Sequence, residues 1–512
     1  MAAAMFVDVS AEVHADIQSA RSDAEAKFAA VLAWLVTPGD KRRLWDVEDD
    51  LWSRLRSVGC ALLALWFACR RARSAPRYVT GPDGRRYRWH GSRRTTVKTI
   101  LGEVPLRRDF YIIGGGKRGD THLPLDRELG LQPSGFSLRS IGMAAYLCAK
   151  MPFAEARCTL LRFLGWAPAT KSLLHVMDQV GPLARPFLEN QPAPTEDGEY
   201  LFVLVDSKGA PMITDTEMSR RRRPHVKRPR EEPGHKWRRR RRNNGAPRKR
   251  RKKGDKSKNA KMANVGVIYS LRVTKGEVEG PIHKRVYGTF LSLERLALWL
   301  RVEAIKRGYG TKRTIFIADG DRKIWNLQQK YFPEAQACLD WYHVVEKLYR
   351  VGETLHAEGT DELTNWVGEQ VADLKSGRVA TVIKRLEQLA AGLSRSGPGT
   401  KGKRNRMRQG LKYLKTNRRR MPYAELLREG LDIGSGAAEG AVRQLVGMRL
   451  DGPGMRWSPA RAEYVLQLRC LVINDIWDDF LTYMENRAHL EGLPAIRPEG
   501  LGDTHSARKK AA

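Results

Sequence analysis

The chain has 512 residues, 42% of them hydrophobic, and 92 Lys and Arg against 57 Asp and Glu give a net charge of +35. This length predicts two to four folded units, and the charge excess favours nucleic acid as a partner. No run reaches the roughly 18 apolar residues that span a bilayer, and the acidic N-terminus does not resemble a secretory signal. The six cysteines form no C-x-x-C pair, which argues against a zinc ribbon and suits a reducing cytoplasm.

The first two regions differ in their periodicity. Residues 1–75 are predicted to be helical, because apolar residues recur every three or four positions until Pro38-Gly39 interrupts them. Residues 76–181 are predicted to form a β-hairpin followed by two helices on either side of Gly165, which is the outline of a DNA-binding helix-turn-helix. A helical hairpin without a DNA-binding role is the alternative. The proline-rich stretch 182–198 is predicted to be a linker.

Residues 199–342 alternate between predicted strands and helices. Apolar runs at 200–205, 265–273, 284–290, 313–318 and 335–339 are expected to be strands, and 291–307 an amphipathic helix. Between the first two strands lies a low-complexity insert, residues 220–261, whose 22 Lys and Arg and three acidic residues give a net charge of +19. It is predicted to be disordered and to bind DNA mainly without sequence selectivity, through its phosphates.

The rest of the chain is predicted to be helical. Residues 343–430 form a helical insertion with a basic loop at 394–408, residues 431–488 a C-terminal active-site helix block, and residues 489–512 a flexible tail. The order of elements predicts an α/β ribonuclease H-like catalytic core with a helical insertion, preceded by helical and small β-hairpin/helix-turn-helix N-terminal regions.

Three carboxylates suit metal-dependent phosphodiester chemistry. Asp206 and Asp319 each follow an apolar run, so parallel neighbouring strands would bring them together at one sheet edge. Glu439, at the start of a predicted helix, would complete a site that is expected to hold two Mg²⁺ or Mn²⁺ ions. Each residue alone also fits a plainer role. The aspartates could form turns, and Glu439 could pair with Arg443 on a solvated helix face.

Asp340 and His343 form a second constellation, three residues apart after another predicted strand. They are predicted either to contact the metal ligands without binding the metal or to supply an alternative ligand. Asp319 and Asp340 are therefore alternative candidates for the second metal ligand. A packed histidine hydrogen-bonded to Asp340 is an equally good interpretation.

Several segments resemble the ISKra-type insertion-sequence transposases, distant relatives of the Mutator-like transposases in the DDE superfamily. The resemblance rests on Ile317-Ala-Asp-Gly320, Leu339-Asp-Trp-Tyr-His343, Ile433-Gly-Ser-Gly436 with Glu439, and Gly454-Met-Arg-Trp-Ser458, and it covers about residues 75–475. By position it implies catalytic and metal-binding roles for Asp206, Asp319 and Glu439. The chain departs from the family pattern in having Trp89-His90 in place of a cysteine-rich segment and in the length and basicity of the insert 220–261. The sequence around Asp206 is Val-Asp-Ser-Lys-Gly, where Asp-Gly is usual.

The resemblance implies cleavage at the ends of an insertion sequence and strand transfer into target DNA. The expected partners are double-stranded DNA (terminal inverted repeats and target) and further copies of the chain on paired ends, in the bacterial cytoplasm near the nucleoid. The predicted DNA contacts are Arg221, Arg222, Lys236, Trp237, Arg238, Arg239, Arg250, Lys252, Arg449, Arg456 and Trp457. The alternatives are a ribonuclease H-like structure-selective endonuclease without strand transfer and a non-catalytic, decayed DNA-binding protein.

Overall fold

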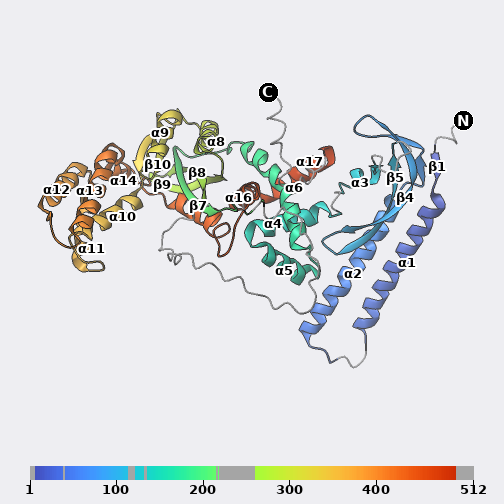
Figure 1. The fold of residues 1–512 in the computed structure, drawn as a ribbon. Coiled ribbons are helices and arrows are strands. Elements are labelled where there is room, and N and C mark those ends of the chain that lie inside the picture. Colours follow the sequence, from blue (N-terminus) through green and yellow to red (C-terminus); the bar gives the residue numbers. More distant parts are fainter. Residues whose placement is uncertain are drawn as a thin grey trace, which may run out of the picture. The chain divides into compact units, whose positions relative to one another are not determined.

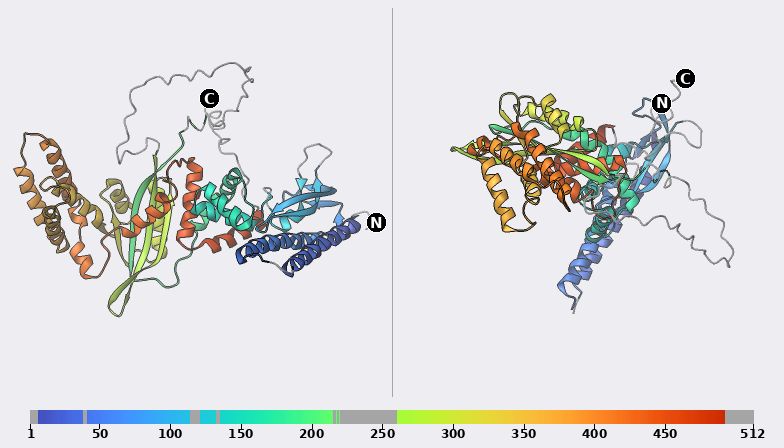
Figure 2. Two further views of the ribbon diagram at one scale, coloured as in Figure 1. Left: turned by 90° about the horizontal axis from the view of Figure 1, so that it is seen from below. Right: turned by 60° about the vertical axis from the view of Figure 1, so that its left-hand side comes forward.

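The computed structural model describes residues 6–37, 41–113, 121–131, 135–214, 217, 219 and 260–491, with side chains to 488. The chain divides into two compact units, Met1–Phe187 with Asp475–Ala512, and Leu188–Asn474. The elements of each unit are labelled in Figure 1, and Figure 2 shows them from two further directions. Among the described helices, none is long and apolar enough to cross a membrane. The predicted break at Pro38-Gly39, most of the basic insert and residues 492–512 of the predicted tail fall outside the described residues. Residues 489–491 of that predicted tail are helical.

The first unit begins with a helical hairpin and a small antiparallel sheet. Helices α1 (Ser10–Leu35) and α2 (Leu44–Arg70) pack side by side, and β1 (Phe6–Asp8) pairs with β2 (Ser74–Pro76). The sheet has the order β3 (Tyr78–Thr80), β4 (Arg86–Lys98), β5 (Glu103–Ile112) and β6 (Thr121–His122). Phe67 of α2 packs on Val97, Val104 and Leu106 of the sheet, so an apolar core joins the hairpin to the strands.

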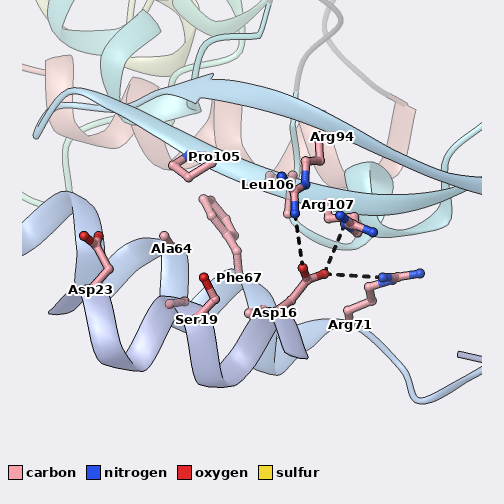
Figure 3. A pocket seen from close by; sticks show the side chains of 12 residues that line it. Asp16, Ser19, Asp23, Ala64, Phe67, Arg71, Arg94, Pro105, Leu106 and Arg107 are labelled. Carbon is pink, nitrogen blue, oxygen red and sulfur yellow. Dashed lines mark ion pairs between the residues drawn. The ribbon is translucent and has the colours of Figure 1, made fainter. Parts of the chain in front are cut away.

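A buried ion network also ties the hairpin to the sheet. The Arg71 side chain is only 2% exposed, and its guanidinium donates hydrogen bonds to Glu12 at 2.7 Å and to Asp109 at 2.8 Å. Figure 3 shows Asp16 ion-paired with both Arg71 and Arg107, on the wall of a pocket of about 350 Å³. Opposite charges from the helices and the strands therefore meet around the buried Arg71 guanidinium.

Helices complete the first unit, and one of them corrects a prediction. They are α3 (Pro124–Glu128), α4 (Leu138–Lys150), α5 (Phe153–Leu164), α6 (Thr170–Glu189) and α17 (Trp477–Glu491). Helix α5 ends at Gly165 with φ +67°, a conformation that favours glycine, and the predicted helix-turn-helix corresponds to α5 and α6. The predicted linker is wrong over 182–189, because α6 continues through Pro182 and Pro186 to Glu189. Leu183, Ala184 and Leu188 are buried there, so tertiary packing outweighs the helix-breaking tendency of proline.

The second unit contains a mixed five-stranded sheet in the order β11-β10-β7-β8-β9. Strands β7 (Tyr200–Pro211), β10 (Arg313–Ala318) and β11 (Gln336–Leu339) are parallel, whereas β8 (Ala260–Thr274) and β9 (Glu277–Thr289) run antiparallel to their neighbours. Residues 201–205 of β7, 315–318 of β10 and 338–339 of β11 are all apolar and buried, as expected for a sheet covered on both faces.

Helices cover both faces of this sheet. Gly266 of β8 lies under Leu296 and Leu300, so α8 (Leu293–Lys306), with α9 (Arg322–Tyr331) beside it, covers one face. Gly288 lies under Leu466 of α16 (Pro459–Ile473). Because Gly288 pairs with Val265, the neighbour of Gly266, it points to the opposite face. That second face also carries α15 (Gly436–Val442) and a π-helical turn, η3 (Arg443–Gly447).

A helical insertion lies between β11 and α15 in the chain. It consists of α10 (Trp341–Gly352), α11 (Asp361–Lys375), α12 (Val379–Gly392), α13 (Thr400–Asn417), a 3₁₀ turn η2 (Arg418–Arg420) and α14 (Tyr423–Arg428). The predicted basic loop 394–408 is wrong from Thr400 onward. Lysine and arginine are good helix formers, and Met407, Gly410 and Leu414 give α13 a buried face.

Candidate active site

Three aspartates lie in a row across the parallel strands. Val205 of β7 is in register with Ala318 of β10, which is in register with Leu339 of β11. The next residues are Asp206, Asp319 and Asp340, so they occupy neighbouring positions about 4.8 Å apart from strand to strand. One expectation is corrected here. Asp206 does not end its strand, because β7 continues beyond the end of β10 and pairs with β8 as far as Pro211.

Glu439 approaches the same face of the sheet from α15. Asp206 pairs with Val265, and Val265 pairs with Gly288, which lies under α16. Since directly paired residues share a face, Asp206 points toward the layer that contains α15. Ser435 immediately precedes this helix, and its hydroxyl lies 3.5 Å from a carboxylate oxygen of Glu439.

The electrostatics show that these acids influence one another. Burial raises the pKa of Asp206, and the negative charges of Asp319 and Glu439 raise it further against an opposing effect of His343. The Ser207 N–H partly offsets this by donating to Asp206 Oδ1 at 2.6 Å. Asp319 Oδ1 accepts from the Asp321 N–H at 2.9 Å, which fixes the turn after β10. Several carboxylates therefore lie close together in this site, and a bound cation would reduce the repulsion between their negative charges.

Asp340 is fully buried and its carboxylate is engaged by several donors. Oδ2 accepts from the His343 backbone N–H at 3.0 Å and lies 2.5 Å from His343 Nδ1, while Oδ1 accepts from the Ser435 N–H at 2.6 Å. Burial acts to raise the pKa of Asp340, but the hydrogen bonds from His343 and Ser435 outweigh it and lower that pKa. The hydrogen bond to Asp340 in turn raises the pKa of His343. Asp340 thus caps α10 and holds the residue that precedes α15.

The described residues include one group of three side chains with metal-ligand spacing. It consists of Asp340, His343 and Glu439, whose candidate ligand atoms all lie within 4.8 Å of one another. Asp206 and Asp319 stand next to this group but are not part of it. With Nδ1 turned to Asp340, His343 keeps Nε2 for another partner, an arrangement typical of carboxylate–histidine–metal sites. The site therefore offers two overlapping ligand sets that share Glu439.

An open cleft of about 780 Å³ lies along the first two aspartates. Asp206 and Asp319 line it together with Lys261 and Lys323. A groove that combines carboxylates with lysines can hold a cation and the phosphates of a polyanion side by side. Lys323 is not among the predicted site residues, because its position beside Asp319 depends on the fold and no local motif records it. Lys261 lies in the predicted basic insert and Ser435 in the Ile433-Gly-Ser-Gly436 segment, but neither was given a role at the site.

The predicted DNA contacts divide into two sets. The eight in the basic insert, from Arg221 to Lys252, lie outside the described residues. Of the other three, Arg449 is 1% exposed and its guanidinium stacks over the Trp457 ring at 4.8 Å. Trp457 is 6% exposed and its indole N–H donates to the Leu450 carbonyl oxygen. Burial does not fit a DNA contact by Arg449 or Trp457, whereas Arg456 is 55% exposed and pairs with Glu217.

Comparisons with known proteins give limited guidance. No protein-family model and no curated protein matches the chain. Among solved structures, the chain is similar to a Drosophila P element transposase in a strand transfer complex. The sequences are 12% identical, the match covers 72% of this chain and 85% of that chain, and the TM-score is 0.25. A likeness at this level carries no argument about activity.

Proposed function

We propose that the chain is a DNA transposase with a ribonuclease H-like core that cleaves at insertion-sequence ends and joins them to target DNA. The observation that carries this proposal is the placement of Asp206 and Asp319 side by side on parallel strands, with Glu439 on the helix layer over the same face. The strand order, with two antiparallel strands on one side of β7 and two parallel strands on the other, fits such a core. The sequence resemblance assigns the same three residues.

The donor set suits a hard divalent cation. Asp206, Asp319 and Glu439 offer only oxygen, which Mg²⁺ and Mn²⁺ accept, and their mutual repulsion favours a cation between them. When bound, two such ions would supply an activated water and neutralise charge on the leaving oxygen. Both oxygens of Asp340 accept from N–H donors, whereas Asp319 accepts one such bond at Oδ1, so we propose Asp319 as the second ligand and Asp340 as a positioning residue. The group of Asp340, His343 and Glu439 is the competing ligand set.

The lysines give the cleft its substrate preference. Lys261 and Lys323 flank Asp206 and Asp319, so we assign them to the phosphates on either side of the scissile bond. Double-stranded DNA, comprising terminal inverted repeats and target, is the proposed substrate. Further copies of the chain on paired ends complete the proposed assembly.

The test is cleavage of a plasmid that carries the gene with its natural flanking DNA, in Mg²⁺ or Mn²⁺. Asp206→Asn, Asp319→Asn and Glu439→Gln are each expected to reduce cleavage by about 100- to 1,000-fold, because each removes a charged ligand. Binding of the same DNA, measured by gel shift, is expected to persist. Glu369→Gln, an exposed acid of α11, is the matched control and should cleave as the wild type does.

The products separate this proposal from its rivals. Joined strands in a transfer assay support a transposase, whereas metal-dependent cleavage without joined product indicates an endonuclease on the same sheet. Binding without cleavage by the wild type, in either metal, would leave a non-catalytic DNA-binding protein. Wild-type cleavage by one of the three variants removes that residue from the mechanism.

A further inference from the structure

Tyr413, on helix α13 of the helical insertion, lies directly against the turn that follows Asp319. A Cβ atom at Gly320 would stand 2.2 Å from Tyr413 Cε2, so the ring covers this backbone and leaves no room for a side chain there. Asn417 Nδ2 donates to the Tyr413 carbonyl oxygen at 3.0 Å, and the Lys347 ammonium lies 5.7 Å from the ring centroid. A residue from the insertion, 94 positions beyond Asp319, therefore completes the wall of the candidate site.

The hydroxyl group of Tyr413 is buried and has no hydrogen-bond partner among the described residues. Leaving a buried polar group unpaired costs about 1–3 kcal/mol, so such a group needs an explanation. Its surroundings are acidic. Burial raises the pKa of Tyr413, and the negative charges of Asp319, Asp340 and Glu346 raise it further. The Gly320 backbone N–H lowers it, but this N–H approaches the hydroxyl without reaching hydrogen-bond geometry. The hydroxyl is thus a protonated donor close to carboxylates.

Packing alone does not account for this residue. A phenylalanine would cover Gly320 with the same ring and would avoid burying an unpaired hydroxyl. Tyr423, in the same unit, shows the contrast, because its buried hydroxyl donates to the Leu339 carbonyl oxygen at 2.8 Å. Carboxylates that bind metal are themselves held by hydrogen bonds from outside, and loss of such a partner typically costs about 10- to 100-fold in metal affinity or activity.

We propose that Tyr413 is a positioning residue for Asp319, and that its hydroxyl donates a hydrogen bond to this carboxylate when the site is loaded with a divalent cation. The inference rests on the proposed function only in taking Asp319 as a metal ligand. It makes the helical insertion part of the site, since the ring seats the Asp319-Gly320 turn and the hydroxyl orients the carboxylate.

The test measures Mn²⁺ binding to the full chain without DNA, from the electron paramagnetic resonance signal of the free ion. Tyr413→Phe is expected to weaken Mn²⁺ binding by about 10- to 100-fold. Its urea unfolding midpoint without metal should stay at the wild-type value or rise, because the hydroxyl has no partner to lose. Gly320→Ala should weaken Mn²⁺ binding as well, since the added methyl group displaces the ring.

Tyr423→Phe is the matched control, because it also deletes one buried phenol oxygen. It should lower the urea midpoint and leave Mn²⁺ affinity unchanged, which is the opposite pattern to Tyr413→Phe. Wild-type Mn²⁺ affinity in Tyr413→Phe overturns the inference, provided that Asp319→Asn binds Mn²⁺ weakly. If Asp319→Asn itself binds Mn²⁺ as tightly as the wild type, the ligand role of Asp319 fails, and the proposed metal site fails with it.

Discussion

At the scale of single residues, the positions of the acidic side chains in the fold define the candidate site, and their identities in the sequence do not. Asp206, Asp319 and Glu439 were each ambiguous in the sequence, where an aspartate after an apolar run is often only a turn former. Strand register settles the relation between the two aspartates by placing them in neighbouring positions. The hydrogen bond between Asp340 and His343 is one of the two predicted interpretations of this pair. The contact with Ser435 could not be predicted, because its N–H reaches Asp340 across 95 residues of chain.

Removing the Asp340 carboxylate should destabilise the protein in a pH-dependent way. Asp340→Ala leaves the His343 and Ser435 amides without their acceptor, a cost on the order of 3 kcal/mol. The raised pKa of His343 adds stability that is fully present below its ordinary value of 6.5 and is lost as the pH rises through the folded value. Urea unfolding should therefore separate the variant from the wild type more widely at pH 6 than at pH 9.

Gln370→Ala serves as the control for that comparison. Its side chain is also buried in the second unit, but it bonds to Trp366 and Arg385 rather than to a titrating partner. It should lower stability by a similar amount at both pH values. An Asp340→Ala deficit that is equal at pH 6 and pH 9 would mean that the pairing of a protonated His343 with Asp340 contributes nothing to stability.

The elements show which patterns the sequence records well. The predicted strand 313–318 matches β10 residue for residue, because a short apolar run between polar residues leaves little choice. The errors occur where tertiary packing overrides a local signal. The prolines of α6 and the glycine at position 402 of α13 disfavour a helix locally, yet the buried faces of these helices keep them helical. Strand β7 exceeds its predicted end for a similar reason, since β8 continues to pair with it.

Just before β7, a buried ion pair connects the end of α8 to β8 and to the segment that leads into β7. Arg307, at the end of α8, has a fully buried side chain that donates to both oxygens of Asp197 and to the Ser270 hydroxyl. Burial acts to raise the pKa of Asp197, but the Arg307 and Ser270 hydrogen bonds, with the charges of Arg307 and Lys312, lower it to about 2. The end of the predicted linker 182–198 is thus held in place by the ion pair between Asp197 and Arg307.

We predict that Asp197→Asn lowers the free energy of unfolding by about 3 kcal/mol at pH 7, because it strands the buried Arg307 guanidinium. A depressed carboxyl pKa contributes stability that is present above the ordinary value of 3.8 and disappears as the pH falls toward about 2. Urea midpoints should therefore differ equally at pH 8 and pH 6 and converge below about pH 4. Asp478→Asn, at the exposed start of α17, should match the wild type throughout. A gap for Asp197→Asn that persists unchanged at pH 3 would contradict this account.

At the scale of the whole molecule, charge is distributed unevenly along the chain. Residues 220–259 carry 21 Lys and Arg and three acidic residues, so this stretch supplies +18 of the net +35. Its flanks lead into paired strands, since Pro211 of β7 is in register with Ala260 of β8. Replacing the insert therefore changes the electrostatics of the molecule while leaving the sheet that carries Asp206 in place.

We expect a variant with residues 220–259 replaced by a Gly/Ser segment of equal length to bind DNA more weakly and with less sensitivity to salt. Each lost phosphate contact reduces the slope of log affinity against log salt concentration by about 0.9 for duplex DNA. Fluorescence anisotropy between about 50 and 200 mM salt measures that slope. A shuffled insert of the same composition is the control and should preserve the slope. Equal slopes for wild type and Gly/Ser variant would show that the insert makes no phosphate contacts.

The two ends of the helical insertion lie next to each other beside β11. The Asp340 carboxylate accepts from the Ser435 amide, and the Trp341 amide donates to the Ile433 carbonyl oxygen. These two hydrogen bonds hold the beginning and the end of the helical insertion together. The position of Glu439 therefore depends on these two hydrogen bonds and not on the length of the helical insertion between them. The helices of the insertion could accordingly be lengthened, shortened or exchanged in evolution without separating Glu439 from Asp206 and Asp319. The condition is that a side chain such as that of Tyr413 still packs on Gly320.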